Sequence, residues 1–324
     1  MTPAAIAAVS AGAAVAVFSV ALTVGANVLY SIAFARKPKT FLRSDPEFAS
    51  DTDCGDTVLD CWATERNWFA ASGAQRVPLE SEDGIPLSAW YLKAPRESKN
   101  TVILVHGYSG KGADMAAFAR FYLEKAGFDV LMPDMRGHGE SGGTFIGFGW
   151  PDRRDLVKWA KMIAERNGPG ASIMLHGVSM GASAVMMAAG EEDLSPAVKF
   201  AVEDCGYTSV EDILRHQLKR MYGLPAFPML NAAEKLAERK IGFSVRDASA
   251  VAQLRKTRIP FLFVHGKVDD FVPFAMERIL YDACPTEKTI MEIEGGKHSD
   301  SFWVAPDAYR DALIHAVSAY FPER

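Results

Sequence analysis

The sequence predicts an α/β fold in which a mainly parallel sheet is flanked by helices. From about residue 75 onward, apolar runs of strand length alternate with helical patterns, as in parallel strands joined by right-handed crossovers. The pentapeptide Gly177-Val178-Ser179-Met180-Gly181 follows one apolar run and precedes a helical pattern of small residues. Asp269 and His298 follow two later runs, so these polar residues are expected to gather at the carboxyl ends of the strands.

Composition agrees with a single catalytic domain. The chain has 324 residues, of which 49% are hydrophobic, and this is enough to bury a large core. A formal net charge of -5 provides no basic surface for nucleic acid, and the sequence contains no phosphate-binding loop or metal-ligand pattern. We therefore expect no nucleic-acid partner, no metal and no organic cofactor, while the oligomeric state stays open.

Residues 1–35 are expected to form an N-terminal transmembrane anchor. No charged residue occurs in residues 4–35, and a bilayer core of about 30 Å needs roughly 20 apolar residues. A cleaved signal peptide is an alternative, suggested by Ala33-Phe34-Ala35. However, the basic start of such a signal is missing and the apolar stretch is too long for one. A helix packed on the domain is the third alternative.

A basic cluster follows the apolar stretch. Its members are Arg36, Lys37, Lys39 and Arg43. Because only the terminal amine precedes the stretch, the positive-inside rule predicts a single-pass protein with a cytoplasmic catalytic domain. The cluster is also suited to anionic headgroups.

Cysteine usage is interpreted through this topology. The four cysteines are Cys54, Cys61, Cys205 and Cys284. In a cytoplasmic domain we expect them to be reduced and buried, whereas a reversed topology would allow Cys54 and Cys61 to close a small disulfide loop.

Residues 36–74 are predicted to form a juxtamembrane linker with a short helix near residues 57–71. Docking on the body is the simpler expectation for the apolar side chains of this helix, and the membrane surface is the alternative. The catalytic domain then spans residues 75–324. It begins with a β-hairpin around Asp83-Gly84, and further helices are expected at residues 112–125 and 152–165.

Ser179 is the candidate nucleophile. A sharp strand-to-helix turn strains the backbone of its middle residue, and glycines two positions before and after it remove side chains that would clash. Ser179 would then stand at a helix N-terminus, where the helix dipole and a free N–H favour the negative charge of acyl transfer. Because a serine between glycines is also common in ordinary turns, this interpretation needs downstream partners.

Asp269 and His298 are the expected partners. Residues 259–264 are typical of a buried strand that leads into Asp269, and residues 289–293 form the run before His298. His298 would accept the serine proton and return it to the leaving group, while Asp269 would orient the imidazole. Asp204, which ends another apparent strand, and Asp270 remain alternative acids.

Four motifs together resemble the alpha/beta-hydrolase superfamily. They are the strand and loop of residues 101–108, the loop of residues 134–141, the Ser179 turn, and the loops that carry Asp269 and His298. The resemblance implies a Ser-His-Asp triad, an acyl-enzyme intermediate, and an oxyanion hole formed by the backbone N–H groups of Tyr108 and Met180. The His-Gly-Tyr and His-Gly-x-x-Asp-x-x-Val-Pro loops are similar to a branch with esterases, acyl-peptidase-like domains and membrane-tethered acyl hydrolases.

An insertion at about residues 207–256 is predicted to form a helical lid. Its apolar cluster could line an acyl pocket or pack the lid against the body. We expect substrate contacts from Met221, Phe227 and Met229, and from the side chain of Tyr108.

The expected function is hydrolysis of carboxylic esters or thioesters, with a hydrophobic small molecule or lipid as the acyl substrate. The membrane is expected to be a partner through the N-terminal helix. An amidase, peptidase or acyltransferase would share every motif, and a noncatalytic binding protein on the same fold is the remaining alternative.

Overall fold

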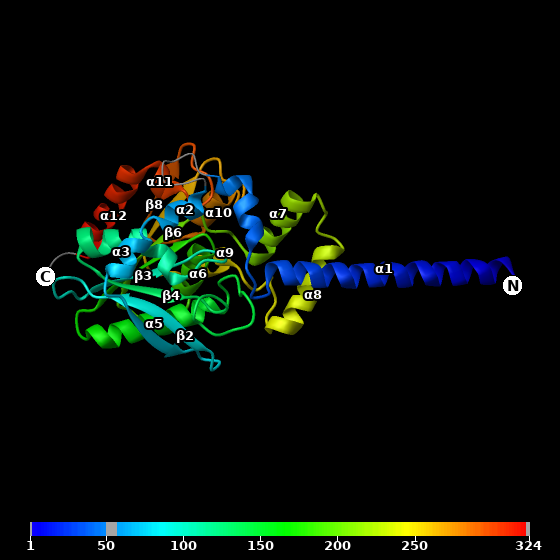
Figure 1. Cartoon of the computed structure of the whole chain (residues 1–324), viewed down its shortest axis with the longest axis horizontal. Coiled ribbons are helices and arrows are strands. Elements are labelled where there is room, and N and C mark those ends of the chain that lie inside the picture. The colour runs from blue at the N-terminus through cyan, green and yellow to red at the C-terminus, as the bar shows by residue number, and fades with distance from the viewer. Residues whose placement is uncertain (1, 50–56, 322–324) are drawn as a thin grey trace.

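The computed structural model describes residues 2–49 and 57–321, and helices flank its central sheet (Figure 1). The strands of the sheet are β1 Gln75–Glu80, β2 Pro86–Leu92, β3 Asn100–Val105, β4 Asp129–Asp134, β5 Ser172–Val178, β6 Val198–Asp204, β7 Phe261–Gly266 and β8 Lys288–Ile293. Their order is β1-β2-β4-β3-β5-β6-β7-β8. β2 pairs antiparallel with β1 and β4, and the remaining pairs are parallel, so the predicted mainly parallel sheet is confirmed.

The helices occupy the connections between strands and the two ends of the chain. They are α1 Pro3–Ala33, α2 Val58–Ala63, α3 Arg66–Ala71, α4 Ala116–Phe121, α5 Asp152–Asn167, α6 Met180–Ala189, α7 Val210–Tyr222, α8 Met229–Ile241, α9 Ala250–Leu254, α10 Ala275–Ala283, α11 Ser301–Val304 and α12 Pro306–Tyr320. Short turns of 3-10 helix at Thr40–Ser44, Pro46–Phe48 and Gly112–Met115 and a π-helical turn at Tyr122–Ala126 supplement them.

Local chemistry explains the predicted hairpin and the helix near residues 57–71. Gly84 has a φ of +78°, a left-handed conformation that glycine adopts without steric cost, and it lies in the turn that joins β1 to β2. Thr57 caps α2 because its hydroxyl accepts the backbone N–H of Asp60, whose carboxylate in turn accepts the N–H of Thr57. The predicted single helix is divided into α2 and α3, which are separated by Thr64 and Glu65.

The central strands form the core that positions the site. Every residue of β4 and β7 is buried, and β3 and β5 are buried except at their first residues. Continuous burial on both faces is expected for parallel strands covered by helices on two sides. The carboxyl ends of β3, β5, β6 and β7 therefore form one firmly packed edge, from which the loops of the site emerge.

Helix α1 both leaves the body and packs against it. Figure 1 shows its N-terminal part projecting away from the domain, and the stretch Val15–Ala33 is long and apolar enough to cross a membrane. Val17 is 70% exposed, whereas Ala26 and Phe34 are buried. The packed-helix alternative therefore applies to the C-terminal turns of α1, while the exposed remainder keeps the length and composition of a candidate membrane span.

Two basic side chains follow α1: Lys39 caps the C-terminal end of the helix, and Arg36 joins the helix end to the loop at residues 139–141. The Lys39 ammonium donates to the backbone carbonyls of Ile32 and Ala35 at 2.5 and 2.9 Å. The Arg36 guanidinium donates to the carbonyls of Gly139 and Ser141, both at 2.7 Å. Cations at this end of a helix neutralise its unpaired carbonyls and its dipole. Arg36 and Lys39 thus both make hydrogen bonds within the protein.

The segment after α1 docks on the body, as the sequence predicts. The Trp62 ring of α2 lies 5.0 Å from the Phe118 ring of α4 and 5.4 Å from the Trp303 ring of α11. Aromatic contacts of this kind hold the linker over the sheet edge.

The cysteine expectation is correct for two residues and wrong for a third. Cys205 and Cys284 are free and buried, whereas Cys61 is disulfide-bonded. Cys54, the residue expected to pair with Cys61 if the topology were reversed, lies outside the described residues.

The insertion at residues 207–256 contains α7, α8 and α9. Figure 1 places α7 and α8 where α1 leaves the body, and α9 lies close to α6 at the base of the insertion. α8 packs closely along α1. The predicted lid thus corresponds to α7 and α8 and has the N-terminal helix as its neighbour, a contact that local sequence pattern does not reveal.

Candidate active site

Ser179 occupies the strained turn between β5 and α6. Its φ of 55° and ψ of -116° are unusual for a residue with a side chain. A Cβ atom at Gly177 would lie 2.3 Å from the Gly181 carbonyl oxygen, and a Cβ atom at Gly181 would lie 2.1 Å from the Val105 carbonyl oxygen. Only glycine fits at positions 177 and 181, because the backbone of another segment lies too close for a Cβ atom. This explains why the Gly-x-Ser-x-Gly motif needs both glycines.

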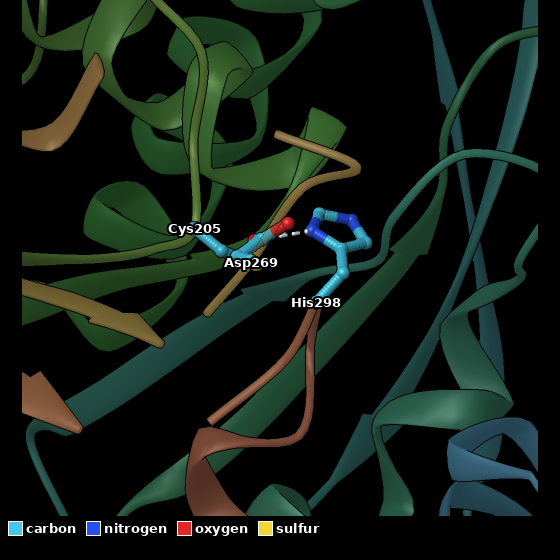
Figure 2. Close-up of side chains that lie close together, drawn as sticks. All are labelled: Cys205, Asp269 and His298. Carbon is cyan, nitrogen blue, oxygen red and sulfur yellow. Dashed lines mark hydrogen bonds and ion pairs between the residues drawn. The ribbon is translucent and has the colours of Figure 1, made fainter. Parts of the chain in front are cut away.

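A continuous hydrogen-bond chain joins the three predicted residues. His298 Nε2 lies 2.8 Å from Ser179 Oγ, and His298 Nδ1 lies 2.8 Å from Asp269 Oδ2, the contact drawn as a dashed line in Figure 2. All three side chains are buried. Three loops that are remote in sequence are brought together because they follow β5, β7 and β8, parallel strands whose carboxyl ends lie at one edge of the sheet.

The environment of Asp269 keeps it ionised. Burial alone would raise the pKa of this carboxyl, but the electrostatic interaction with His298 and hydrogen bonds from His265 and His298 lower it to about 2. Its Oδ1 atom also accepts the backbone N–H of Val272 at 2.8 Å. Because an ionised carboxylate only accepts hydrogen bonds, the proton of His298 must sit on Nδ1, and Nε2 is free to accept the Ser179 proton.

The two alternative acids lie elsewhere. Asp204 accepts a hydrogen bond from the Tyr309 hydroxyl at 2.9 Å, and burial raises the pKa of Asp204 to about 7. The Asp270 side chain is 67% exposed and pairs with Arg220 at 3.4 Å. A one-residue step along the turn has redirected its side chain, so Asp269 is the carboxylate that contacts His298.

Cys205 completes a group of three potential metal ligands with Asp269 and His298, shown in Figure 2. Its thiol lies 3.4 Å from the Ser299 hydroxyl, and burial raises its pKa well above the usual range. A protonated thiol is a poor ligand, and both ring nitrogens of His298 already make hydrogen bonds. The donor set fits a proton-transfer chain better than a metal centre.

The proposed oxyanion donors lie on two segments in contact with each other, the first turn of α6 and the loop after β3. Met180 is the first residue of α6, so its N–H has no partner within the helix. Tyr108 lies in the loop after β3, where His106 Nε2 accepts the N–H of Met135 at 3.0 Å and fixes the start of the loop. The close approach of Gly181 to Val105 holds this loop against the Ser179 turn.

The Tyr108 side chain has a role that sequence reasoning missed. Its hydroxyl donates to the backbone carbonyls of Ala33 at 2.8 Å and Ile32 at 3.1 Å, in the last turn of α1. The tyrosine ring stacks on Phe148 with a centroid distance of 5.4 Å. One residue therefore links the loop beside Ser179 to the end of the N-terminal helix.

An apolar cavity of about 110 Å³ reaches Ser179. Its wall includes Leu29, Ile32 and Ala33 from α1 and the adjacent Phe34; Ile213, Leu214, Leu218, Met221 and Tyr222 from α7; and Leu230, Ala233 and Glu234 from α8. The Tyr108 side chain and Met180 also line it. Within the sequence there is no pattern that distinguishes wall residues of α1 from lipid-facing ones.

Of the three lid residues expected to contact substrate, the structure places one in this wall. Met221 lines the cavity. Phe227 does not, since it is 76% exposed at the tip of the lid, and Met229 lies against α1, where a Cβ atom on Gly25 would be 2.6 Å from its sulfur. The lid tip points outward and α8 turns Met229 toward α1, which corrects the expectation for these two residues.

A second, more polar cavity of about 230 Å³ also reaches Ser179 and His298. Arg43, Arg66 and Asp114 contribute charged groups to its wall, together with the 107–110 loop. Arg43 pairs with Asp60 at 3.2 Å. The serine hydroxyl thus stands where an apolar space and a polar space meet, and a substrate with two chemically different halves could occupy both.

Comparisons with known proteins agree with this site. Residues 96–203 match the family described as serine aminopeptidase S33, and residues 151–299 match the family described as serine hydrolase (FSH1). The chain belongs to the alpha/beta-hydrolase superfamily of serine hydrolases.

The individual relatives span most of the chain. The Bacillus subtilis protein YqkD is 30% identical over 223 residues, which cover 69% of this chain and 72% of YqkD. The Saccharomyces cerevisiae membrane protein YNL320W is 25% identical over 275 residues, covering 79% and 87% of the two chains. A Pyrococcus furiosus esterase structure superposes with a TM-score of 0.63 at 22% identity, covering 79% of this chain and 94% of the esterase, and this likeness shows the fold.

Proposed function

We propose that this protein is a serine esterase or thioesterase that acts on hydrophobic acyl substrates. Ser179 is the nucleophile, His298 the general base and acid, and Asp269 the residue that orients His298. The observation that carries the proposal is the hydrogen-bond chain from Ser179 Oγ through His298 to an ionised Asp269, next to an apolar cavity. Two buried hydrogen bonds of 2.8 Å make this serine more nucleophilic than an ordinary hydroxyl.

The reaction follows from this geometry. Ser179 Oγ attacks the acyl carbon while its proton moves to His298 Nε2, and Asp269 stabilises the imidazolium through Nδ1. The carbonyl oxygen becomes an oxyanion facing the N–H groups of Tyr108 and Met180, where each donor contributes about 10²- to 10³-fold to the rate. Collapse of this intermediate expels the alcohol or thiol, which takes the proton from His298. Water then resolves the acyl-enzyme by the same steps.

The two cavities suggest how a substrate is oriented. We assign the acyl chain to the apolar cavity and the leaving group to the polar cavity, because burial of methylenes is favourable only where no polar group is left unpaired. Arg43 and Arg66 would then face the leaving group. An amidase, peptidase or acyltransferase could use the same serine, and product analysis with competing amine and alcohol acceptors separates these reactions.

We also propose that α1 is a single membrane span. Its length and its exposed apolar side chains support this assignment, as does the name of the yeast relative. The side of the membrane on which the domain lies is a separate question. Arg36 and Lys39 form hydrogen bonds with backbone carbonyls of the protein, so their presence after α1 is explained without the membrane. This weakens the positive-inside argument for a cytoplasmic domain. The disulfide at Cys61 is typical of an oxidising compartment, and we propose that the domain faces one. Alkylation of Cys61 in intact cells without reduction would contradict this and favour the cytoplasm.

Intact-mass detection of a fluorophosphonate adduct tests the proposed chemistry without a known substrate. We expect one adduct on the wild type and none on Ser179→Ala or His298→Ala. Ser183→Ala is the matched control, because Ser183 is a buried serine one turn further along α6 whose hydroxyl hydrogen-bonds the Tyr207 backbone. An adduct that persists in Ser179→Ala, or no adduct on folded wild type, would contradict the proposal.

The acyl preference needs a second measurement. We expect octanoyl esters to be cleaved with a clearly higher kcat/KM than acetyl esters, because the added methylenes enter the apolar cavity. Comparable values for the two chain lengths would remove support for a hydrophobic acyl substrate while leaving the nucleophile assignment intact.

A further inference from the structure

The end of the N-terminal helix forms part of the space in front of Ser179. Leu29, Ile32, Ala33 and Phe34 line the same apolar cavity as Ser179 and Met180. A helix that served only as a tether would need no contact with the site. Here, the cavity is lined by the C-terminal end of α1, and the N-terminal part of the same apolar helix projects away from the domain (Figure 1).

We propose that the last turns of α1 belong to the acyl-binding site, and that the acyl chain of a membrane-resident ester enters the cavity from the bilayer between α1 and the lid helices. This inference rests on the proposed function and makes it more specific. The substrate class is a long-chain acyl ester or thioester whose chain lies in the membrane before it is cleaved.

Helix length places the cavity at the membrane surface. The part of α1 that precedes its packing on α8 near Gly25 has about 22 residues, or roughly 33 Å at 1.5 Å per residue, and this matches a hydrocarbon core of about 30 Å. We therefore place the bilayer surface near Gly25, inside the long apolar stretch Val15–Ala33, whose last turns leave the bilayer and pack on α8. Leu29 is only one turn further along the helix, so a chain leaving the bilayer has a short path to Ser179.

The lid carries exposed apolar side chains at the same level. Tyr222 is 45% exposed, Leu224 43% and Phe227 76%, and they immediately precede Met229, which contacts α1 at Gly25. Exposed aromatic and aliphatic residues beside a membrane span are suited to the interface between headgroups and acyl chains. Tyr222 also lines the cavity. It therefore joins the lipid-facing lid tip to the interior of the acyl site.

The same helix end is bonded to the loop that holds an oxyanion donor. The Tyr108 hydroxyl donates to the Ala33 and Ile32 carbonyls of α1, while the Tyr108 backbone N–H is assigned to the oxyanion hole. Lys39 binds the Ile32 carbonyl as well. These hydrogen bonds fix the position of α1 relative to the reacting carbonyl. A cavity wall can select among acyl chains only if its position is fixed in this way.

Photocrosslinking from the bilayer tests the inference independently of turnover. Full-length Ser179→Ala protein is reconstituted in phosphatidylcholine vesicles containing phosphatidylcholine with a terminal diazirine on its palmitoyl chain. After irradiation, adducts are mapped by mass spectrometry. We expect adducts on Ile213 and Leu218 of α7, which are each 4% exposed and line the cavity.

Two substitutions on neighbouring positions of α1 make the comparison specific. Leu29→Trp fills the cavity and is expected to lower the Ile213 and Leu218 adducts about tenfold, the scale of effect that one or two methylenes have in an apolar pocket. With Ser179 restored, it should lower the ratio of kcat/KM for palmitoyl over acetyl esters by about the same factor. Val28→Trp, on the face where Val28 is 50% exposed, should change neither quantity.

The outcomes separate the inference from the proposed function. Adducts confined to the exposed face of α1, or equal effects of Leu29→Trp and Val28→Trp, would overturn the inference even if the wild type cleaves esters. Labelling of Ile213 and Leu218 that depends on Leu29 would support the inference even if no ester is hydrolysed, in which case the proposed chemistry fails and the lipid-binding site stands.

Discussion

The substitution Gly181→Ala tests whether activity depends on the close contact between the Ser179 turn and the loop after β3. An added Cβ atom would lie 2.1 Å from the Val105 carbonyl oxygen and 2.7 Å from that of His106, both backbone atoms that cannot rotate away. Since real Cβ atoms keep at least 3.0 Å from such neighbours, the two segments must separate by about 0.9 Å.

A separation of this size acts on the oxyanion donors. Tyr108 lies on one side of the contact and Met180 on the other, so the movement stretches a hydrogen bond of about 2.9 Å beyond its effective range at one of them. Loss of one donor is expected to lower the rate about 10²- to 10³-fold. The accompanying overpacking should destabilise the fold by about 1–3 kcal/mol, which leaves the protein folded.

The assay is the second-order rate of fluorophosphonate labelling, measured beside the thermal unfolding midpoint. Ala188→Gly is the control, because a glycine near the far end of α6 costs about 1 kcal/mol or more of stability without touching the Ser179 turn. We expect a much lower labelling rate for Gly181→Ala and a nearly wild-type rate for Ala188→Gly. Labelling of Gly181→Ala at the wild-type rate, or equal losses in both variants, would refute the reasoning.

Three further predictions concern residues around the same site. Asp269→Asn should lower kcat/KM by about 10³- to 10⁴-fold, because a neutral amide no longer fixes the His298 tautomer, whereas Asp270→Asn should have little effect; equal losses in steady-state assays would contradict this. Tyr108→Phe removes the hydroxyl that holds the end of α1 and should cost about 1–2 kcal/mol in chemical denaturation, and no change would show that this contact is unimportant. Despite burial, hydrogen bonds to Asp269 and Glu277 raise the pKa of His265 to about 10, so its charged form stabilises the fold fully below about pH 6.5 and is lost as pH rises through 10. Unfolding free energies should therefore decrease between these pH values in the wild type and not in His265→Gln, and parallel curves would argue against a charged His265.

Much of the site could be predicted from short segments of sequence. The glycines around Ser179 and the positions of Asp269 and His298 after apolar runs are local features, and each strand delivers its loop to the same sheet edge. For the catalytic acid the sequence pattern left Asp269 and Asp270 as alternatives, and both lie in the same turn. Asp270 differs from Asp269 only in the direction of its side chain, and backbone geometry within the loop determines that direction.

What the sequence by itself determined was the sheet, the order of the three site residues and the presence of a helix long enough for a membrane. Only the tertiary structure decided which residues surround the acyl cavity: Met221 lines it, Phe227 points outward, Met229 faces α1, and Leu29 supplies wall. The sequence pattern of apolar residues is the same whether their side chains contact lipid, the lid or the substrate. The rotation of α1 against α8 is set by packing between segments about 200 residues apart, and such contacts have no local signature.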